Sequence, residues 1–175
     1  MPVILLYYNS FLGVYYNKQM IAISIPGRAS YEIAHIVCDV NGTLALDGNL
    51  LSGVANRIIQ LRTHAQVHLI TANTFAMQEK IDRILGFPSI RLQPGNETAQ
   101  KAAFVESLNA DTVIAIGQGA NDAGMLAKAA IGLGILSKEG IARESLLAAD
   151  LLLPDIMSAF DCLENPQRII ASLRK

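Results

Sequence analysis

An aspartate at the end of a buried apolar run is the residue of this sequence best placed to do chemistry. Residues 33–38 form the run, Asp39 ends it, and Asn41, Gly42 and Thr43 follow at once. In an open parallel α/β sheet, ligands bind just beyond the carboxyl ends of the strands. A carboxylate there can act as a nucleophile or bind a hard cation. The structural alternative is a strand that ends in an Asx turn, with Asp39 and Asn41 hydrogen bonded to local backbone.

Three further segments carry residues that could act together with Asp39. The apolar run at residues 67–70 ends in Thr71, Lys101 lies near the start of a helical pattern, and residues 117–122 read Gly-Gln-Gly-Ala-Asn-Asp. Each segment alone has a structural explanation. Thr71 could bond local backbone, Lys101 could be solvated, and Asp122 could favour the N-terminal dipole of the helix that follows. The joint order and spacing of the four segments favours the functional interpretation.

In this order, the four segments resemble the haloacid dehalogenase-like superfamily, from about residue 33 to about residue 154. In that superfamily the first motif reads DxDx(T/V), the second is an apolar run ending in Thr or Ser, the third is a Lys, and the fourth often reads GDGxND. Within it, the chain looks most like the small soluble proteins related to the phosphorylation domain of P-type ATPases. The resemblance implies a Rossmann-like three-layer α/β sandwich with a central, mostly parallel sheet.

The resemblance also implies a Mg²⁺-dependent phosphohydrolase that acts through an aspartyl-phosphate. Asp39 would be the nucleophile, and Lys101 would offset the charge of phosphate and carboxylate. The residues implied to bind the substrate are Thr43, Thr71, Ala72, Asn73 and Asn121. Those implied to bind the metal are Asp39, the backbone carbonyl of Asn41, Gln118, and Asp122 directly or through water. The glycines Gly117 and Gly119 would let backbone approach the site closely.

Two positions depart from the pattern of the superfamily. Asn41 stands at the catalytic position where its phosphatases carry an Asp that protonates the leaving group and then activates water. An amide can do neither, and such general acid–base help is worth ~10²–10⁴-fold. Gln118 replaces a metal-binding Asp, and a neutral amide is a weaker ligand for Mg²⁺. The leading interpretation is therefore a phosphohydrolase of low turnover, and the alternative is a catalytically impaired binding or regulatory protein.

The composition suits one globular domain with a sizeable core. The chain has 175 residues, of which 51% are hydrophobic and 17% charged, with a net charge of −1. No basic excess indicates a nucleic-acid partner, and no polybasic block or apolar run of ~20 residues indicates a membrane. We expect a phosphorylated small molecule or a phosphoprotein as substrate and the cytoplasm as location. An open site and an apolar N-terminal hairpin favour a homo-oligomer.

Alternating strands and helices predict a parallel sheet with helices on both faces. We expect a hairpin of strands at residues 21–25 and 31–37, and further strands at 67–70, 90–92, 112–116, 131–136 and 151–153. Helices are predicted at residues 53–64, 74–85, 97–108, 120–130, 141–148 and 155–163, and residues 166–173 close the chain. The intervals between Asp39 and Thr71 and between Thr71 and Lys101 are filled by these elements, so we expect no inserted cap domain.

The first nineteen residues differ from the rest. Residues 1–16 are apolar and aromatic but interrupted, and no basic region precedes them, which argues against a secretory signal. A cleaner pattern begins at Met20. Our hypothesis is that Met20 is the natural start, that residues 1–19 are an upstream translation artefact, and that residues 20–175 form the single domain. The alternative is a genuine extra strand.

Overall fold

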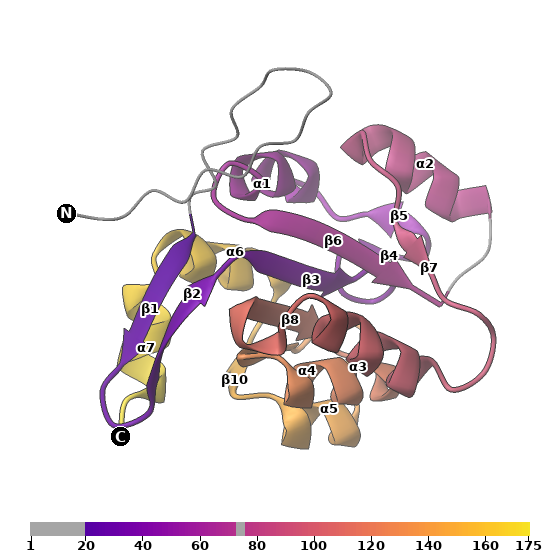
Figure 1. The fold of residues 1–175 in the computed structure, drawn as a ribbon. Coiled ribbons are helices and arrows are strands. Elements are labelled where there is room, and N and C mark those ends of the chain that lie inside the picture. The colour runs from indigo at the N-terminus through magenta and orange to yellow at the C-terminus, as the bar shows by residue number, and fades with distance from the viewer. Residues whose placement is uncertain (1–19, 73–75) are drawn as a thin grey trace, which may run out of the picture.

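The computed structural model describes residues 20–72 and 76–175, and its centre is a parallel sheet of six strands (Figure 1). The strand order is β10-β9-β8-β3-β6-β7, so that β3 lies between β8 and β6. The strands are β3 (His35–Asp39), β6 (Gln66–Thr71), β7 (Ile90–Arg91), β8 (Val113–Gly117), β9 (Ile131–Ile135) and β10 (Leu151–Leu153). The chain leaves β3 toward β6 on one side and returns to β8 on the other, which makes the end of β3 the switch point of the topology.

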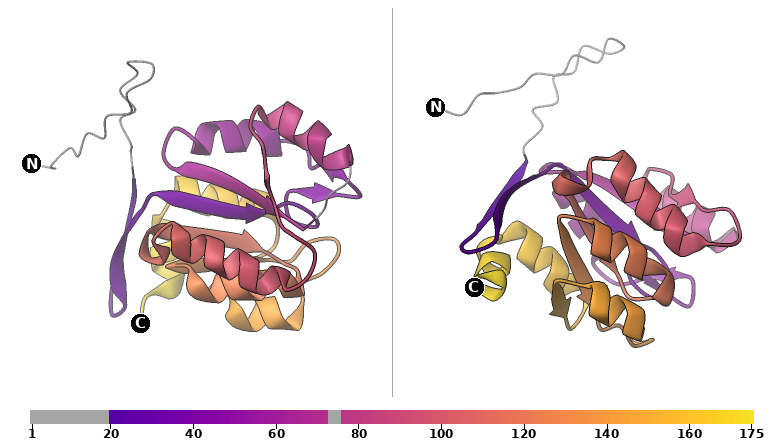
Figure 2. Two further views of the ribbon diagram at one scale, coloured as in Figure 1. Left: turned by 45° about the vertical axis from the view of Figure 1, so that its right-hand side comes forward. Right: turned by 60° about the horizontal axis from the view of Figure 1, so that its bottom comes forward.

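Helices cover both faces of this sheet. One layer consists of α1 (Val54–Leu61), α2 (Ala76–Leu85), α6 (Ile156–Glu164) and α7 (Gln167–Leu173). The other consists of α3 (Glu97–Ser107), α4 (Ala123–Lys128) and α5 (Arg143–Ala148) (Figure 2). Two short 3₁₀ turns, η1 (Ala110–Thr112) and η2 (Ala120–Asp122), precede β8 and α4. The predicted three-layer α/β sandwich is therefore confirmed.

The strand that carries Asp39 is buried on both faces, as a central parallel strand must be. Ile36 and Cys38 pack into the core on the side of α1 and α6, whereas Val37 packs into the core beside α3 and α4. Successive side chains of a strand point to opposite faces, so an unbroken apolar run serves both cores. All five residues of β8 are buried for the same reason.

The predicted N-terminal hairpin is present as β1 (Ile21–Ile25) and β2 (Ala29–Ile33), which pair antiparallel apart from the main sheet. The prediction of one strand over residues 31–37 was wrong in its extent. The chain changes partners at Ala34, because β2 pairs only with β1, whereas β3 pairs with β6 and β8. The buried face of the hairpin packs against α7 (Figure 1).

Most other elements differ from prediction only by a few residues at their ends, and two differences are larger. A small hairpin, β4 (Ala45–Leu46) and β5 (Asn49–Leu50), was not predicted. Its turn residues Asp47 and Gly48 have φ of 50° and 73°, as a tight two-residue hairpin turn requires. The predicted helix over residues 120–130 begins instead as η2 and ends, as α4, at Lys128.

The expected absence of a cap domain agrees with the described segments. Between β3 and β6 they contain only β4, β5 and α1, and between β6 and α3 only α2 and β7. Within residues 20–72 and 76–175, no helix is long and apolar enough to cross a membrane. The hypothesis about residues 1–19 concerns a part of the chain outside the described residues.

Candidate active site

Three charged side chains from distant parts of the chain meet at the carboxyl end of β3. Asp39 is the last residue of β3, Lys101 lies on α3, and Asp122 ends η2. The ammonium of Lys101 donates to Asp39 Oδ1 at 2.7 Å and to Asp122 Oδ1 at 2.5 Å. The structure thus brings together the nucleophile, the lysine and one metal-binding residue that the sequence suggested.

Lys101 is fully buried, which is rare for a lysine and is tolerated only when the charge is paired. Burial alone would lower its pKa, but the charges of Asp39 and Asp122 outweigh burial and raise the pKa above the usual value. One ammonium is therefore shared by two buried carboxylates. The cluster has an excess of negative charge, which an additional cation would neutralise.

Asp39 is the less firmly held of the two carboxylates. Its side chain has only two hydrogen-bond donors among the described residues: Lys101, and the hydroxyl of Thr43 at 3.3 Å from Oδ2. Burial and the nearby charge of Asp122 raise the pKa of Asp39 to about 7, although both donors act in the opposite direction. A positive group that approaches Asp39 therefore stabilises the ionised form of its carboxylate.

Asp122 is held much more firmly. Its Oδ2 accepts the backbone N–H groups of Gln118 and Gly119, each at 2.8 Å, while Oδ1 accepts from Lys101. A Cβ added to Gly117 would lie 2.6 Å from Cγ of Asp122. Glycine at that position is therefore required for the close approach. Asp122 fixes the loop after β8 in place, in addition to pairing with Lys101.

Of the predicted substrate-binding residues, Thr43 and Asn121 contact this cluster directly. The amide of Asn41 donates to the hydroxyl of Thr71 at 3.0 Å, which joins the loop after β3 to the end of β6. Asn121 Oδ1 lies 3.5 Å from the ammonium of Lys101. Ala72 is exposed, in the bend after β6. Asn73 lies outside the described residues.

Gln118 has a partner that the sequence analysis missed. Its Nε2 donates to Oε2 of Glu139 at 3.3 Å, and both groups lie directly over Gly42. A Cβ on Gly42 would come within 2.1 Å of Gln118 Nε2 and 2.4 Å of the Glu139 carboxylate. Glu139 follows the end of β9, so the rule that strand ends carry function could have indicated it.

Comparison with known proteins agrees with this fold. No model of a known protein family matches the chain. The uncharacterized protein MJ0073 of Methanocaldococcus jannaschii is 33% identical over 84 residues, which are 46% of this chain and 90% of that protein. The chain belongs to the same family as MJ0073.

Solved structures with the same fold come from several bacteria. A HAD superfamily hydrolase (subfamily III A) from Legionella pneumophila superposes with a TM-score of 0.64 at 17% identity, over 81% of this chain and 87% of that one. The cobalt-bound deoxy-D-mannose-octulosonate 8-phosphate phosphatase of Haemophilus influenzae gives 0.63 at 14% identity, over 78% and 90%. The corresponding Moraxella catarrhalis phosphatase, in complex with magnesium, phosphate and KDO, gives 0.57 at 15% identity, over 81% and 94%. The chain therefore has the haloacid dehalogenase-like fold.

Proposed function

We propose that this protein is a metal-dependent phosphohydrolase of low turnover that acts through an aspartyl-phosphate on Asp39. The observation that carries the proposal is the buried ammonium of Lys101 between Asp39 and Asp122, at the switch point of a parallel sheet. A buried lysine shared by two carboxylates is costly as a structural element alone, because it leaves one negative charge uncompensated. It suits a site that receives further charged groups.

The residues present fit Mg²⁺ as the expected metal. Within residues 20–72 and 76–175, no three His, Cys, Asp or Glu side chains form a ready-made metal site. Magnesium does not need one, because it is usually bound by one or two carboxylates together with water and substrate phosphate. Asp39, the carbonyl of Asn41 and the amide oxygen of Gln118 would hold it, with Asp122 acting through water. The ion would neutralise charge on the phosphate and on Asp39.

The chain's own residues supply most of what phosphoryl transfer requires, which is positioning and charge compensation. A carboxylate oxygen of Asp39 attacks phosphorus, the ester oxygen leaves, and the phosphoryl group becomes attached to Asp39. Lys101 stays within hydrogen-bonding distance of Asp39 and offsets the charge on the transferred group. The hydroxyl of Thr43, which donates to Asp39, and the hydroxyl of Thr71, at the end of β6, would help to hold oxygens of the phosphoryl group.

The weak point of this machinery is proton transfer. Asn41 has no proton to give to the leaving group and cannot take one from the attacking water. Both steps then depend on solvent, and hydrolysis of the aspartyl-phosphate is expected to be slow.

A beryllium fluoride experiment tests the proposal, because this complex imitates a phosphoryl group bound to a carboxylate. With Mg²⁺ present, beryllium fluoride should raise the melting temperature of the wild-type protein and should leave Asp39→Asn unchanged. The matched control is Asp111→Asn, a change of the same type at an exposed residue of η1. Equal stabilisation of wild type and Asp39→Asn would remove Asp39 from the mechanism.

The second candidate function is phosphate-ester binding or regulation without turnover. The amide at Asn41 and the amide at Gln118 favour it, because each replaces a group that chemistry at this site would use. A panel of phosphorylated small molecules and phosphopeptides, assayed with and without Mg²⁺, separates the two. Binding without phosphate release would support the second candidate.

A further inference from the structure

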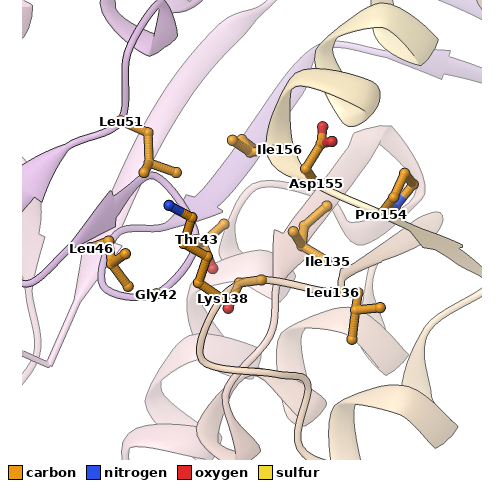
Figure 3. Close-up of a pocket in the computed structure, with 11 residues that line it drawn as sticks. Gly42, Thr43, Leu46, Leu51, Ile135, Leu136, Lys138, Pro154, Asp155 and Ile156 are labelled. Atoms are coloured by element: carbon orange, nitrogen blue, oxygen red, sulfur yellow. The ribbon is translucent and has the colours of Figure 1, made fainter.

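A cavity of about 340 Å³ opens beside the candidate active site and has no role in the scheme above (Figure 3). It lies at the carboxyl ends of β3, β9 and β10, next to the β4–β5 hairpin. Its volume falls in the range of pockets that hold small organic molecules, roughly 300–1,000 Å³. The lining residues are Gly42, Thr43, Leu46, Leu51, Ile135, Leu136, Ser137, Lys138, Pro154, Asp155 and Ile156.

Thr43 connects the cavity to the nucleophile. Its side chain lines the cavity, and its hydroxyl donates to Oδ2 of Asp39 at 3.3 Å. Gly42, the preceding residue, also lines the cavity. The cavity therefore reaches a direct hydrogen-bond neighbour of Asp39, so a phosphate ester attacked by Asp39 could extend its organic part into the cavity.

The chemistry of the lining is mainly apolar. The β4–β5 hairpin contributes leucines, the ends of β9 and β10 contribute aliphatic side chains and a proline, and α6 contributes Ile156. Leu136 is 56% exposed although it lines the cavity, so its apolar surface is available to a ligand. Sugars with many hydroxyls would find few hydrogen-bond partners here, whereas an aromatic or branched aliphatic group would bury apolar surface favourably.

Among the described residues, Lys138 brings a positive charge to the cavity. Lys138 forms no ion pair or hydrogen bond with any residue in the two described segments, and Figure 3 shows its side chain extended along the cavity beside Thr43. Asp155, the carboxylate that the described residues contribute to the lining, accepts the N–H of Ser158 at 2.7 Å and so caps α6. A negatively charged group on the ligand would give Lys138 a partner that none of the described residues provides.

We propose that this cavity binds the organic part of the substrate, and that the substrate is a phosphate monoester with an apolar body and a carboxylate. The proposal rests on the proposed function, because it assigns the phosphoryl group to Asp39. It adds the substrate class, for which the fold family alone gives no information.

Binding of phosphonates, which are not hydrolysed, tests the assignment independently of turnover. Three probes are compared by calorimetry with Mg²⁺: methylphosphonate, benzylphosphonate and 4-carboxybenzylphosphonate. Wild-type protein should bind the benzyl probe on the order of tenfold more tightly than the methyl probe, because the ring buries apolar surface. The carboxylated probe should bind several-fold more tightly again.

Variants at two residues show which side chains cause the gains in affinity. Leu136→Ser should reduce the advantage of the benzyl probe several-fold, and it should not disturb folding because Leu136 is half exposed. Lys138→Gln should remove the advantage of the carboxylate and leave methylphosphonate binding unchanged, while Lys138→Arg should retain most of that advantage. The matched control is Leu147→Ser, which changes a leucine that is 72% exposed and does not line the cavity.

The outcomes separate the two proposals. Equal binding of the methyl and benzyl probes by wild type would overturn the cavity assignment and leave the phosphohydrolase proposal standing. Loss of affinity in Leu147→Ser equal to that in Leu136→Ser would also overturn the assignment. A failure of all three probes to bind, together with no response to beryllium fluoride, would overturn both proposals.

Discussion

The side-chain amide of Asn41 donates a hydrogen bond to the hydroxyl of Thr71 at 3.0 Å. This bond joins the loop after β3 to the end of β6, the two segments that flank the candidate phosphate site. A hydroxyl can donate as well as accept, so an aspartate of nearly the same shape could accept from Thr71 in the same position. The structure can therefore accommodate a general acid at residue 41.

Asn41→Asp should raise the turnover of a phosphomonoester by ~10–10³-fold, because it restores the proton transfer that is worth ~10²–10⁴-fold in general acid–base catalysis. The Michaelis constant should change much less. Steady-state kinetics with a poor leaving group and saturating Mg²⁺ provide the measurement. Asn41→Ala, which also removes the bond to Thr71, should give no gain. Unchanged turnover in Asn41→Asp with intact Mg²⁺ binding would make the binding function the better proposal.

Neutralising Asp39 and neutralising Asp122 should change the melting temperature in opposite directions. Asp39→Asn should raise the melting temperature of metal-free protein at pH 8, because burial raises the pKa of Asp39 to about 7 and its charge destabilises the fold above that pH. Asp122→Asn should lower the melting temperature, because Asp122 accepts from Lys101 and two backbone amides.

Thermal unfolding in the presence of a chelator measures both effects. A change of 1 kcal/mol corresponds to about 2–4 °C in a chain of this size. Shifts of the same sign in the two variants would contradict the charge balance that we derive for the cluster.

Gln118→Asp should tighten Mg²⁺ binding, because it adds an anionic oxygen where the wild type has an amide. The gain should be larger in the double variant Gln118→Asp/Glu139→Gln, since Glu139 lies 3.3 Å from the amide of Gln118 and would repel a carboxylate there. Glu139→Gln alone is the control. Calorimetry with Mg²⁺ provides the affinities. If Asp122→Ala abolishes binding while Gln118→Asp has no effect, Asp122 is the essential residue.

Both cysteines should resist thiol reagents in the folded protein. Cys38 and Cys162 are buried free thiols, and burial raises the pKa of each. The thiolate is the reactive form, so little of it is present at pH 8. Both thiols should react with Ellman's reagent only after the protein has been denatured by guanidinium. A rapid reaction of one thiol in the native protein would show that its surroundings open in solution.

The sequence was sufficient to predict the sheet and the position of Asp39, because apolar runs that end in polar residues are a local signal. It was not sufficient for Lys101, which taken alone is expected to be a solvated helix residue. Its burial depends on Asp39 and Asp122, which lie far from it along the chain. In the sequence, the order of the four segments was the signal that linked Lys101 with Asp39 and Asp122.

The sequence pattern did not predict the β4–β5 hairpin or the positions of Lys138 and Glu139, for different reasons. The β4–β5 hairpin has strands of two residues each, too short to show alternation, although Asp47-Gly48 is a turn signal that a closer inspection could use. Lys138 and Glu139 lie in a loop after β9. The composition of a loop does not indicate where its side chains point. Their relation to Gly42 and Thr43 arises from the parallel arrangement of β3 and β9 on either side of β8.

The N-terminal hairpin has a consequence for biosynthesis. Its strand β1 packs against α7, and the backbone N–H of Lys175 donates to the carbonyl of Pro26 at 3.3 Å. The ribosome makes β1 and β2 before every other described element and α7 after all of them. An isolated pair of strands is at best marginally stable in water. The isoleucine face of the hairpin therefore lacks its cover until α7 has been synthesised, which makes it a natural contact for chaperones that attend nascent chains.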